Sequence, residues 1–191
     1  EDLKMPRIRP VAEKQALTWA QVNQIANGLP ERLSVLTRLL ALTGLRIGEA
    51  AALRWDRVNL TAKHITVNGE HIPPLQIAVR ESYSHGAFSL CKTEASRRNV
   101  VIPDSMVAEL RALPRTSEFV FAGPKGAILN AHNEAARELK PAALKAGLPW
   151  VGWHTYRHTF ATLADIAGFT ASEKRLALGH TTDSMSLHYS H

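Results

Sequence analysis

Residues 154–162 have the sequence H-T-Y-R-H-T-F-A-T, in which His154, Arg157 and His158 recur at helical spacing. At about 100° per residue, these three basic side chains cluster on one side of a helix. Apolar side chains are expected on roughly the opposite side, namely Phe160, Leu163 and Ala167. The pattern predicts a helix over 155–167 whose apolar face packs on a core, while its basic face lines a cleft or meets solvent.

Two further motifs accompany this helix. Residues 176–180 have the sequence L-A-L-G-H, and Tyr189 follows two residues before the last one. Residues 43–49, T-G-L-R-I-G-E, supply a second arginine, Arg46. This set contains neither the carboxylate cluster of a metal nuclease nor a Gly-rich phosphate loop. It suits a phosphodiester whose charge is held by guanidinium groups while a phenol oxygen attacks phosphorus.

Taken together and in this order, the three motifs resemble those of the tyrosine recombinases, the phage integrase family. The resemblance extends from about Leu17 to His191 and corresponds to the catalytic domain of that family. It implies an α+β fold, mostly helical with a small antiparallel sheet. It also implies DNA cleavage and rejoining through a covalent 3′-phosphotyrosine, with no cofactor and no metal.

The resemblance assigns a role to each matching residue. Arg46 and Arg157 correspond to the two catalytic arginines, and Glu49 to the acidic residue that accompanies the first. His154 begins the H-x-x-R motif and is a candidate base for the tyrosine proton, because a phenol has a pKa near 10. The remaining catalytic positions correspond to Lys92, the proton donor to the leaving oxygen, His180, a phosphate ligand, and Tyr189, the nucleophile.

Several assignments have alternatives. Lys63 is a second strand-adjacent lysine, but it lacks the K-T-E-A-S-R-R-N-V-V-I-P context of Lys92. Tyr156 lies within the H-x-x-R motif, and we interpret it as a packing residue. His154 and His158 could hold zinc from one helix face, although the glutamate of H-E-x-x-H is missing. Four other basic residues could be phosphate contacts or solvated side chains: Arg97, Arg98, Lys174 and Arg175.

Local patterns predict most of the secondary structure. Thr18 is the expected N-cap of a helix to Asn27, and helices are expected over 31–43, 47–53, 104–113, 131–146, 172–178 and 184–189. Strands are expected over 64–67, 118–121, and 88–92 and 99–102 around a polar turn. Residues 69–86 could be an extended loop or an extra hairpin.

Composition limits the class of protein. With 191 residues, 45% of them hydrophobic and 21% charged, the chain can form one domain with a substantial core. The net charge of +6 is compatible with double-stranded DNA as partner. No apolar run approaches a membrane span, and a single cysteine, Cys91, favours a reducing compartment, here the cytoplasm of a bacterial host.

The ends of the chain suggest how it belongs in a larger protein. Residues 1–16 have the character of a linker after a further DNA-binding region, followed by the catalytic domain over 17–191. The full-length protein is expected to form a homotetramer on DNA, whereas the chain by itself could be a monomer. Rival functions are a type IB topoisomerase-like strand transferase, an inactive DNA-binding module and a zinc hydrolase.

Overall fold

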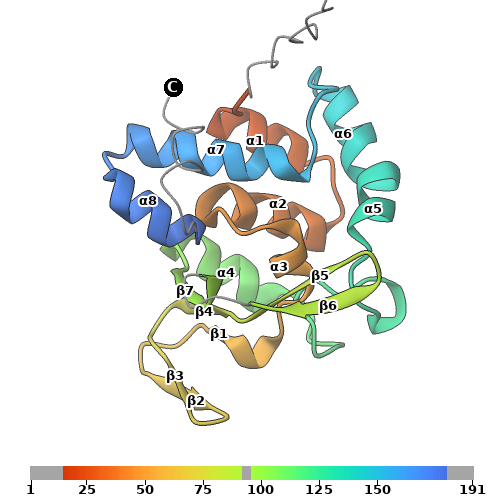
Figure 1. Ribbon diagram of the computed structural model, residues 1–191. Coiled ribbons are helices and arrows are strands. Elements are labelled where there is room, and N and C mark those ends of the chain that lie inside the picture. Colours follow the sequence, from red (N-terminus) through yellow and green to blue (C-terminus); the bar gives the residue numbers. More distant parts are fainter. Residues whose placement is uncertain (1–14, 92–95, 180–191) are drawn as a thin grey trace, which may run out of the picture.

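Helices surround one central helix in the computed structural model, which describes residues 15–91 and 96–179. Figure 1 shows α7 and α1 on one side of α2, α4 on the other, and α5 and α6 along one flank. The helices are α1 (Trp19–Ala26), α2 (Glu31–Thr43), α3 (Ile47–Ala51), α4 (Asp104–Ala112), α5 (Ala131–Glu134), α6 (Lys140–Lys145), α7 (Trp153–Ile166) and α8 (Ala171–Leu178).

The strands form three small antiparallel units. A three-stranded sheet has the order β1 (Val58–Asn59), β4 (Gln76–Val79) and β7 (Arg98–Val101). The two hairpins are β2–β3 (Ile65–Val67, Glu70–Ile72) and β5–β6 (Glu81–Ser84, Ala87–Leu90). The first hairpin projects from the body, whereas the second lies across α3 (Figure 1). The predicted α+β class is therefore confirmed.

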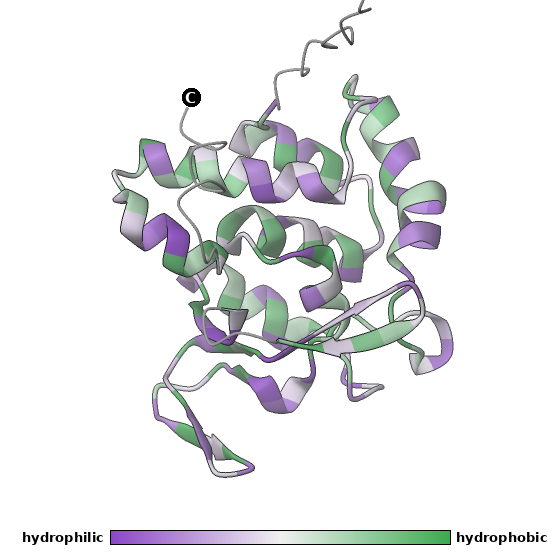
Figure 2. Cartoon of the chain, in the orientation of Figure 1, coloured by the Kyte–Doolittle hydropathy of each residue, from purple (hydrophilic) through white to green (hydrophobic). Residues whose placement is uncertain are grey.

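Helix α2 forms the centre of the core. Leu33, Leu36, Leu39 and Leu40 are completely buried, and Val35, Thr37 and Ala41 are buried as well. The helix is thus covered on most of its circumference, as expected of a helix at the centre of a core. Purple and green segments alternate along α5, α6 and α8 in Figure 2, as expected for peripheral helices with one solvated face.

Helix ends agree closely with the local signals. Thr18 caps α1 by accepting a hydrogen bond from the backbone N–H of Gln21 at 3.2 Å. Gly44 ends α2 in the left-handed conformation at φ 67°. The expected helix over 131–146 contains one π-helical turn, Ala135–Leu139, before α6. Pro141 follows that turn and has no N–H to donate to the carbonyl one turn back, which explains the irregularity.

The predicted strand partners are wrong in one place. Strands do occupy 87–90 and 98–101, but β6 pairs with β5, and β7 pairs with β4. Residues 69–86 are not a loop, because they contribute to both hairpins and to β4. The hairpin turns, Asn68-Gly69 and His85-Gly86, have positive φ at both residues, as the tight turns of two-residue hairpins require. Residues 118–121 form only a bridge, between Arg54 and Phe119.

Candidate active site

Arg46 lies at the N-terminus of α3 and is fixed by Glu49. The backbone N–H of Arg46 donates to Glu49 Oε2 at 2.8 Å, and Arg46 Nη1 donates to Glu49 Oε1 at 3.1 Å. The Arg46 side chain remains 41% exposed, while that of Glu49 is 4% exposed. Arg46 is therefore held by Glu49 through its backbone and one guanidinium nitrogen, while the rest of the guanidinium group can bind an anion from solvent.

Glu49 is a buried carboxylate held by two arginines. In addition to the hydrogen bonds from Arg46, it accepts one from each terminal nitrogen of Arg98, with Nη1–Oε1 at 3.0 Å and Nη2–Oε2 at 2.9 Å. Burial alone would raise the pKa of Glu49, but the hydrogen bonds and charges of Arg98 and Arg46 outweigh it and hold that pKa below its usual value. Glu49 is thus ionised and can orient Arg46 at neutral pH.

Arg157 is turned into the protein interior, with 1% exposure. Its Nη1 donates to the carbonyl oxygen of Gly44 at 2.5 Å, and its Nη2 donates to that of Leu178 at 2.6 Å. The expectation that it lines an open basic face is wrong. At 100° per residue it lies only about 60° from Phe160, so it shares the buried side of α7.

These contacts bring two predicted residues to one place. Arg157 binds the carbonyl of Gly44, two residues before Arg46, and so ties α7 to the turn that carries Arg46. Through Leu178 it also holds the C-terminal end of α8, two residues before the L-G-H histidine in the sequence. Lys92, His180 and Tyr189 lie outside the described residues, as does the helix expected over 184–189.

His154 lies in the first turn of α7 and is exposed. Its ring is 4.7 Å from that of His158, with the two planes perpendicular. Residues 15–91 and 96–179 contain no group of three or more His, Cys, Asp or Glu side chains that could hold a metal ion. The His154–His158 pair therefore has no third ligand of these types within that part of the chain.

Tyr156 packs in the core, as expected. It has no exposed surface, and its ring is 6.4 Å from that of Trp153. Its hydroxyl has no hydrogen-bond partner among the described residues, and burial raises its pKa far above the usual value. A phenol that is covered and this difficult to ionise is a poor nucleophile. Tyr189 therefore remains the candidate nucleophile, and Tyr156 does not compete with it.

Two of the ambiguous basic residues have structural contacts. Arg98 is buried, and besides Glu49 it binds the carbonyl oxygen of Ala177 through Nε at 2.8 Å. Lys174 is buried as well and contacts the carboxylate of Asp165. Neither is a solvated side chain. Arg97, by contrast, is exposed.

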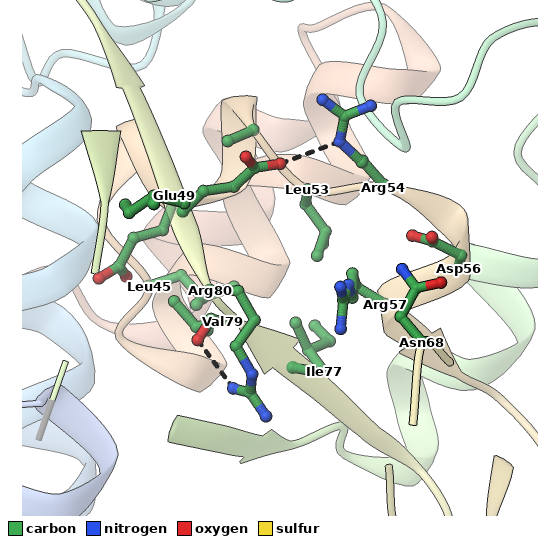
Figure 3. Close-up of a pocket in the computed structure, with 14 residues that line it drawn as sticks. Leu45, Glu49, Leu53, Arg54, Asp56, Arg57, Asn68, Ile77, Val79 and Arg80 are labelled. Atoms are coloured by element: carbon green, nitrogen blue, oxygen red, sulfur yellow. Dashed lines mark hydrogen bonds and ion pairs between the residues drawn. The ribbon is translucent and has the colours of Figure 1, made fainter. Parts of the chain in front are cut away.

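A hollow of about 370 Å³ lies between α3 and β4, and Glu49 forms part of its lining. Figure 3 shows its lining, where Arg54 donates to Glu81 and Arg80 to the carbonyl of Val79. Arg57 and Arg80 both contact Glu70. Because Arg46, His154 and Arg157 do not line the hollow, we do not assign it to the site.

The thiol of Cys91 provides a probe of the Glu49 charge. Burial raises its pKa, the negative charge of Glu49 raises it further, and Arg98 opposes them. Replacing Glu49 by glutamine removes the negative charge that raises the thiol pKa and keeps the positive charge of Arg98 that lowers it. The thiol pKa is therefore expected to fall. Since Cys91 is the sole cysteine, the pH dependence of iodoacetamide alkylation, followed by intact mass, measures it. Glu118→Gln, which removes an exposed carboxylate, is the control and should leave the thiol pKa unchanged. An unchanged or higher thiol pKa in Glu49→Gln would contradict the ionised state of Glu49.

The structure is an α+β domain in which α2, α3 and α7 meet at two arginines, Arg46 open to solvent and Arg157 buried behind the turn that carries it. Residues 15–191 match the phage integrase family. The chain belongs to that family.

Curated relatives agree with this assignment. The integrase of Mycobacterium phage FRAT1 is 29% identical over 197 residues, covering 97% of this chain and 55% of the relative. Tyrosine recombinase XerD of Bradyrhizobium diazoefficiens is 30% identical over 168 residues, covering 84% and 48%. The chain thus spans about half the length of the curated relatives it matches.

The likeness to solved structures shows a shared fold. The Tn1549 transposon integrase, in complex with transposon right end DNA, superposes with a TM-score of 0.77 at 17% identity, covering 93% of this chain and 62% of that one. The catalytic domain of bacteriophage HP1 integrase gives 0.58 at 21% identity, covering 92% and 86%. No helix within the described ranges is long and apolar enough to cross a membrane.

Proposed function

We propose that this chain is the catalytic part of a site-specific DNA recombinase that integrates or excises a phage or another mobile element. The observation that carries the proposal is Arg46, which is anchored by Glu49 yet exposed, in a chain of the phage integrase family. Residues 17–191 form the catalytic domain, and residues 1–16 the linker from a DNA-binding region.

In the proposed reaction the phenol oxygen of Tyr189 attacks the scissile phosphorus, and the 5′ oxygen of the departing strand leaves. His154 assists removal of the phenol proton, and Lys92 gives a proton to the leaving oxygen. One phosphodiester is exchanged for another of similar energy, so the 5′ hydroxyl can attack the phosphotyrosine and reseal the strand without an external energy source.

The arginines stabilise the charge that gathers on the non-bridging oxygens, together with His180. Arg46 can meet a phosphate in the observed conformation because it is exposed. Arg157 is covered, so its contact with phosphate requires displacement of the atoms above it. Even without such a contact it supports the reaction, because it holds the turn that carries Arg46.

The proposed partner is double-stranded DNA, held mainly through its phosphates, in the cytoplasm of a bacterial host. We propose a homotetramer on DNA for the full-length protein and a monomer for the chain by itself. Two observations support DNA and a multimer. The Tn1549 integrase was solved with transposon DNA, and a lambda integrase tetramer, with a TM-score of 0.61 to this chain, was solved bound to a Holliday junction.

A covalent trap tests the chemistry. The chain is incubated, with EDTA present, with duplexes that carry one 5′-bridging phosphorothiolate between randomised base pairs, so that the poor nucleophilicity of the released thiol prevents resealing. We expect a protein–DNA adduct that is lost completely in Tyr189→Phe, and the recovered DNA gives the preferred sequence. An adduct that persists in Tyr189→Phe would refute the nucleophile, and no adduct with any sequence would refute the activity.

Unmodified DNA, which allows resealing, separates the rival functions. A recombinase produces exchanged strands from two duplexes, whereas a type IB topoisomerase-like enzyme only relaxes supercoiled plasmid. An inactive DNA-binding module would bind the duplex pool without forming an adduct. For Lys92, the better leaving group should restore cleavage to Lys92→Ala, because a thiolate does not need the proton.

A further inference from the structure

Arg98 connects the elements that surround the candidate site. It lies at the start of β7, is 5% exposed, and makes hydrogen bonds in two directions. Its two terminal nitrogens hold the carboxylate of Glu49 on α3, and its Nε holds the carbonyl of Ala177 at the end of α8. A single planar group therefore joins the sheet to two helices that are distant in the sequence.

We propose that Arg98 is a positioning residue for the cleavage reaction, which holds Glu49, and through it Arg46, in register with the C-terminal end of α8. This inference rests on the proposed function. Arg98 does not touch the phosphate in this assignment; it acts only through Glu49 and α8. The same α8 end is held from the other side by Arg157, which binds the carbonyl of the adjacent residue, Leu178.

The geometry requires a guanidinium group at this position. The fork binds both oxygens of one carboxylate, and the third nitrogen lies in the same plane, so Glu49 and Ala177 are held at a fixed separation. A lysine carries one ammonium group on a flexible stem and cannot span both partners with defined orientation. Arg98→Lys therefore keeps the charge but loses the register.

Stability alone gives a weak reason for such a pair. Both side chains of the Arg98–Glu49 pair are almost completely buried, at 3% and 4% exposure. Desolvation of buried ions consumes much of their attraction, so buried pairs add little net stability compared with apolar replacements. What this pair supplies is a defined direction for Glu49, and Glu49 in turn binds both the backbone and the side chain of Arg46.

The test compares Arg98→Lys and Arg98→Met with the wild-type chain on the trapped phosphorothiolate duplex. Binding affinity, the single-turnover cleavage rate constant at saturating DNA and the thermal midpoint are measured separately. We expect the rate constant to fall on the order of 100-fold, because small misplacements of a reacting group have costs of this size. Affinity should change by less than about threefold, because duplex binding is spread over many phosphate contacts.

Arg57→Lys is the matched control, because Arg57 also pairs with a carboxylate, that of Glu70, but makes no hydrogen bond or ion pair with Glu49 or Arg46. It should cleave at the wild-type rate. Rates are compared at a temperature at which every variant is folded, so that lower stability is not mistaken for misplacement.

A pH profile gives a readout that a purely structural role would not change. Glu49 is faced by Arg98 from β7, by Arg46 from α3 and by the thiol of Cys91 after β6. Removing the Arg98 charge and its hydrogen bonds raises the pKa of Glu49, so in Arg98→Met the acid limb of the cleavage rate should move to higher pH. Arg57→Lys should keep the wild-type profile.

The outcomes are distinguishable. If the wild type forms the Tyr189-dependent adduct, but folded Arg98→Met and Arg98→Lys cleave at its rate and with its pH profile, the positioning role is refuted. It is refuted as well if the rate loss follows only the thermal midpoint and disappears on cooling. If the wild type forms no adduct, the proposed function fails first, and this inference fails with it.

Discussion

Arg157→Met is expected to reduce cleavage of the trapped duplex by about 100- to 1,000-fold, the range found when one preorganised charge-stabilising donor is removed. The structure gives two reasons for a large loss. Any guanidinium contact with the phosphate disappears, and the carbonyl of Gly44 loses its partner, so that the turn before Arg46 is released. Single-turnover kinetics at saturating DNA measure the effect apart from binding.

The same substitution should also lower the free energy of unfolding. Two buried carbonyls, those of Gly44 and Leu178, lose their donor, and each unsatisfied group costs about 1–3 kcal/mol. We expect a loss of about 2–5 kcal/mol, measured by urea denaturation with tryptophan fluorescence. The exposed Arg137→Met, on the π-helical turn, should stay within about 0.5 kcal/mol of wild type.

Arg157→Lys separates the two reasons. Lysine preserves the charge and can donate to one of the two carbonyls, but it cannot hold both in one plane. If orientation of the turn matters most, its cleavage rate should lie close to that of Arg157→Met. A rate near wild type would contradict the contact with Gly44 as the source of the effect and would leave charge alone as the contribution of Arg157.

Sequence patterns predicted the helices well because their ends depend on local chemistry. Thr18 caps its helix with its own hydroxyl, and Gly44 ends α2 because glycine accepts a positive φ without strain. Strand partners depend on contacts distant in the sequence. The local pattern therefore pairs β6 with β7, whereas in the structure β6 pairs with β5 and β7 with β4. The local dipeptide Asn68-Gly69 was the available signal for the first hairpin.

The motifs single out Arg46, Glu49 and Arg157 in the sequence, but they do not indicate that Glu49, Arg98 and Arg157 are buried. Arg98 precedes the predicted strand by one residue; in β7 it shares the buried face with Val100, while Asn99 and Val101 face outward. Extending the strand alternation by one residue would have assigned it to the interior. Arg157 lies three and four residues before Phe160 and Ala161, both buried, so the helical period also indicated an inward direction.

Gly44→Ala is expected to destabilise the protein by about 2–5 kcal/mol, from two separate causes. Gly44 has a φ of 67°, where a side chain costs about 1–2 kcal/mol. A Cβ there would also lie 2.5 Å from Cδ1 of Phe160 and 2.8 Å from Cδ2 of Leu178, and such overpacking costs about 1–3 kcal/mol. Urea denaturation gives the total.

A matched glycine isolates the conformational cost. Gly69, in the turn between β2 and β3, has a φ of 79°, but a Cβ there meets no atom within 4 Å. Gly69→Ala should therefore lose only about 1–2 kcal/mol, and the excess in Gly44→Ala measures the clash. An equal loss at both positions would contradict the close approach of Phe160 and Leu178 to Gly44.

The clash at Gly44 should also affect cleavage. An alanine there pushes against Phe160 on α7 and Leu178 on α8, the two helices that Arg157 joins, and Gly44 itself supplies one of the carbonyls that Arg157 binds. Any shift of this turn moves Arg46, two residues on, so the rate should fall even where the variant is fully folded. The double variant Gly44→Ala/Phe160→Leu replaces the opposing ring by a smaller side chain and removes the 2.5 Å contact. It should restore part of both the stability and the rate. If the losses of the two single variants instead add in the double variant, Phe160 and the turn at Gly44 act independently. That result would contradict the inference that packing between α7 and α8 affects the position of Arg46.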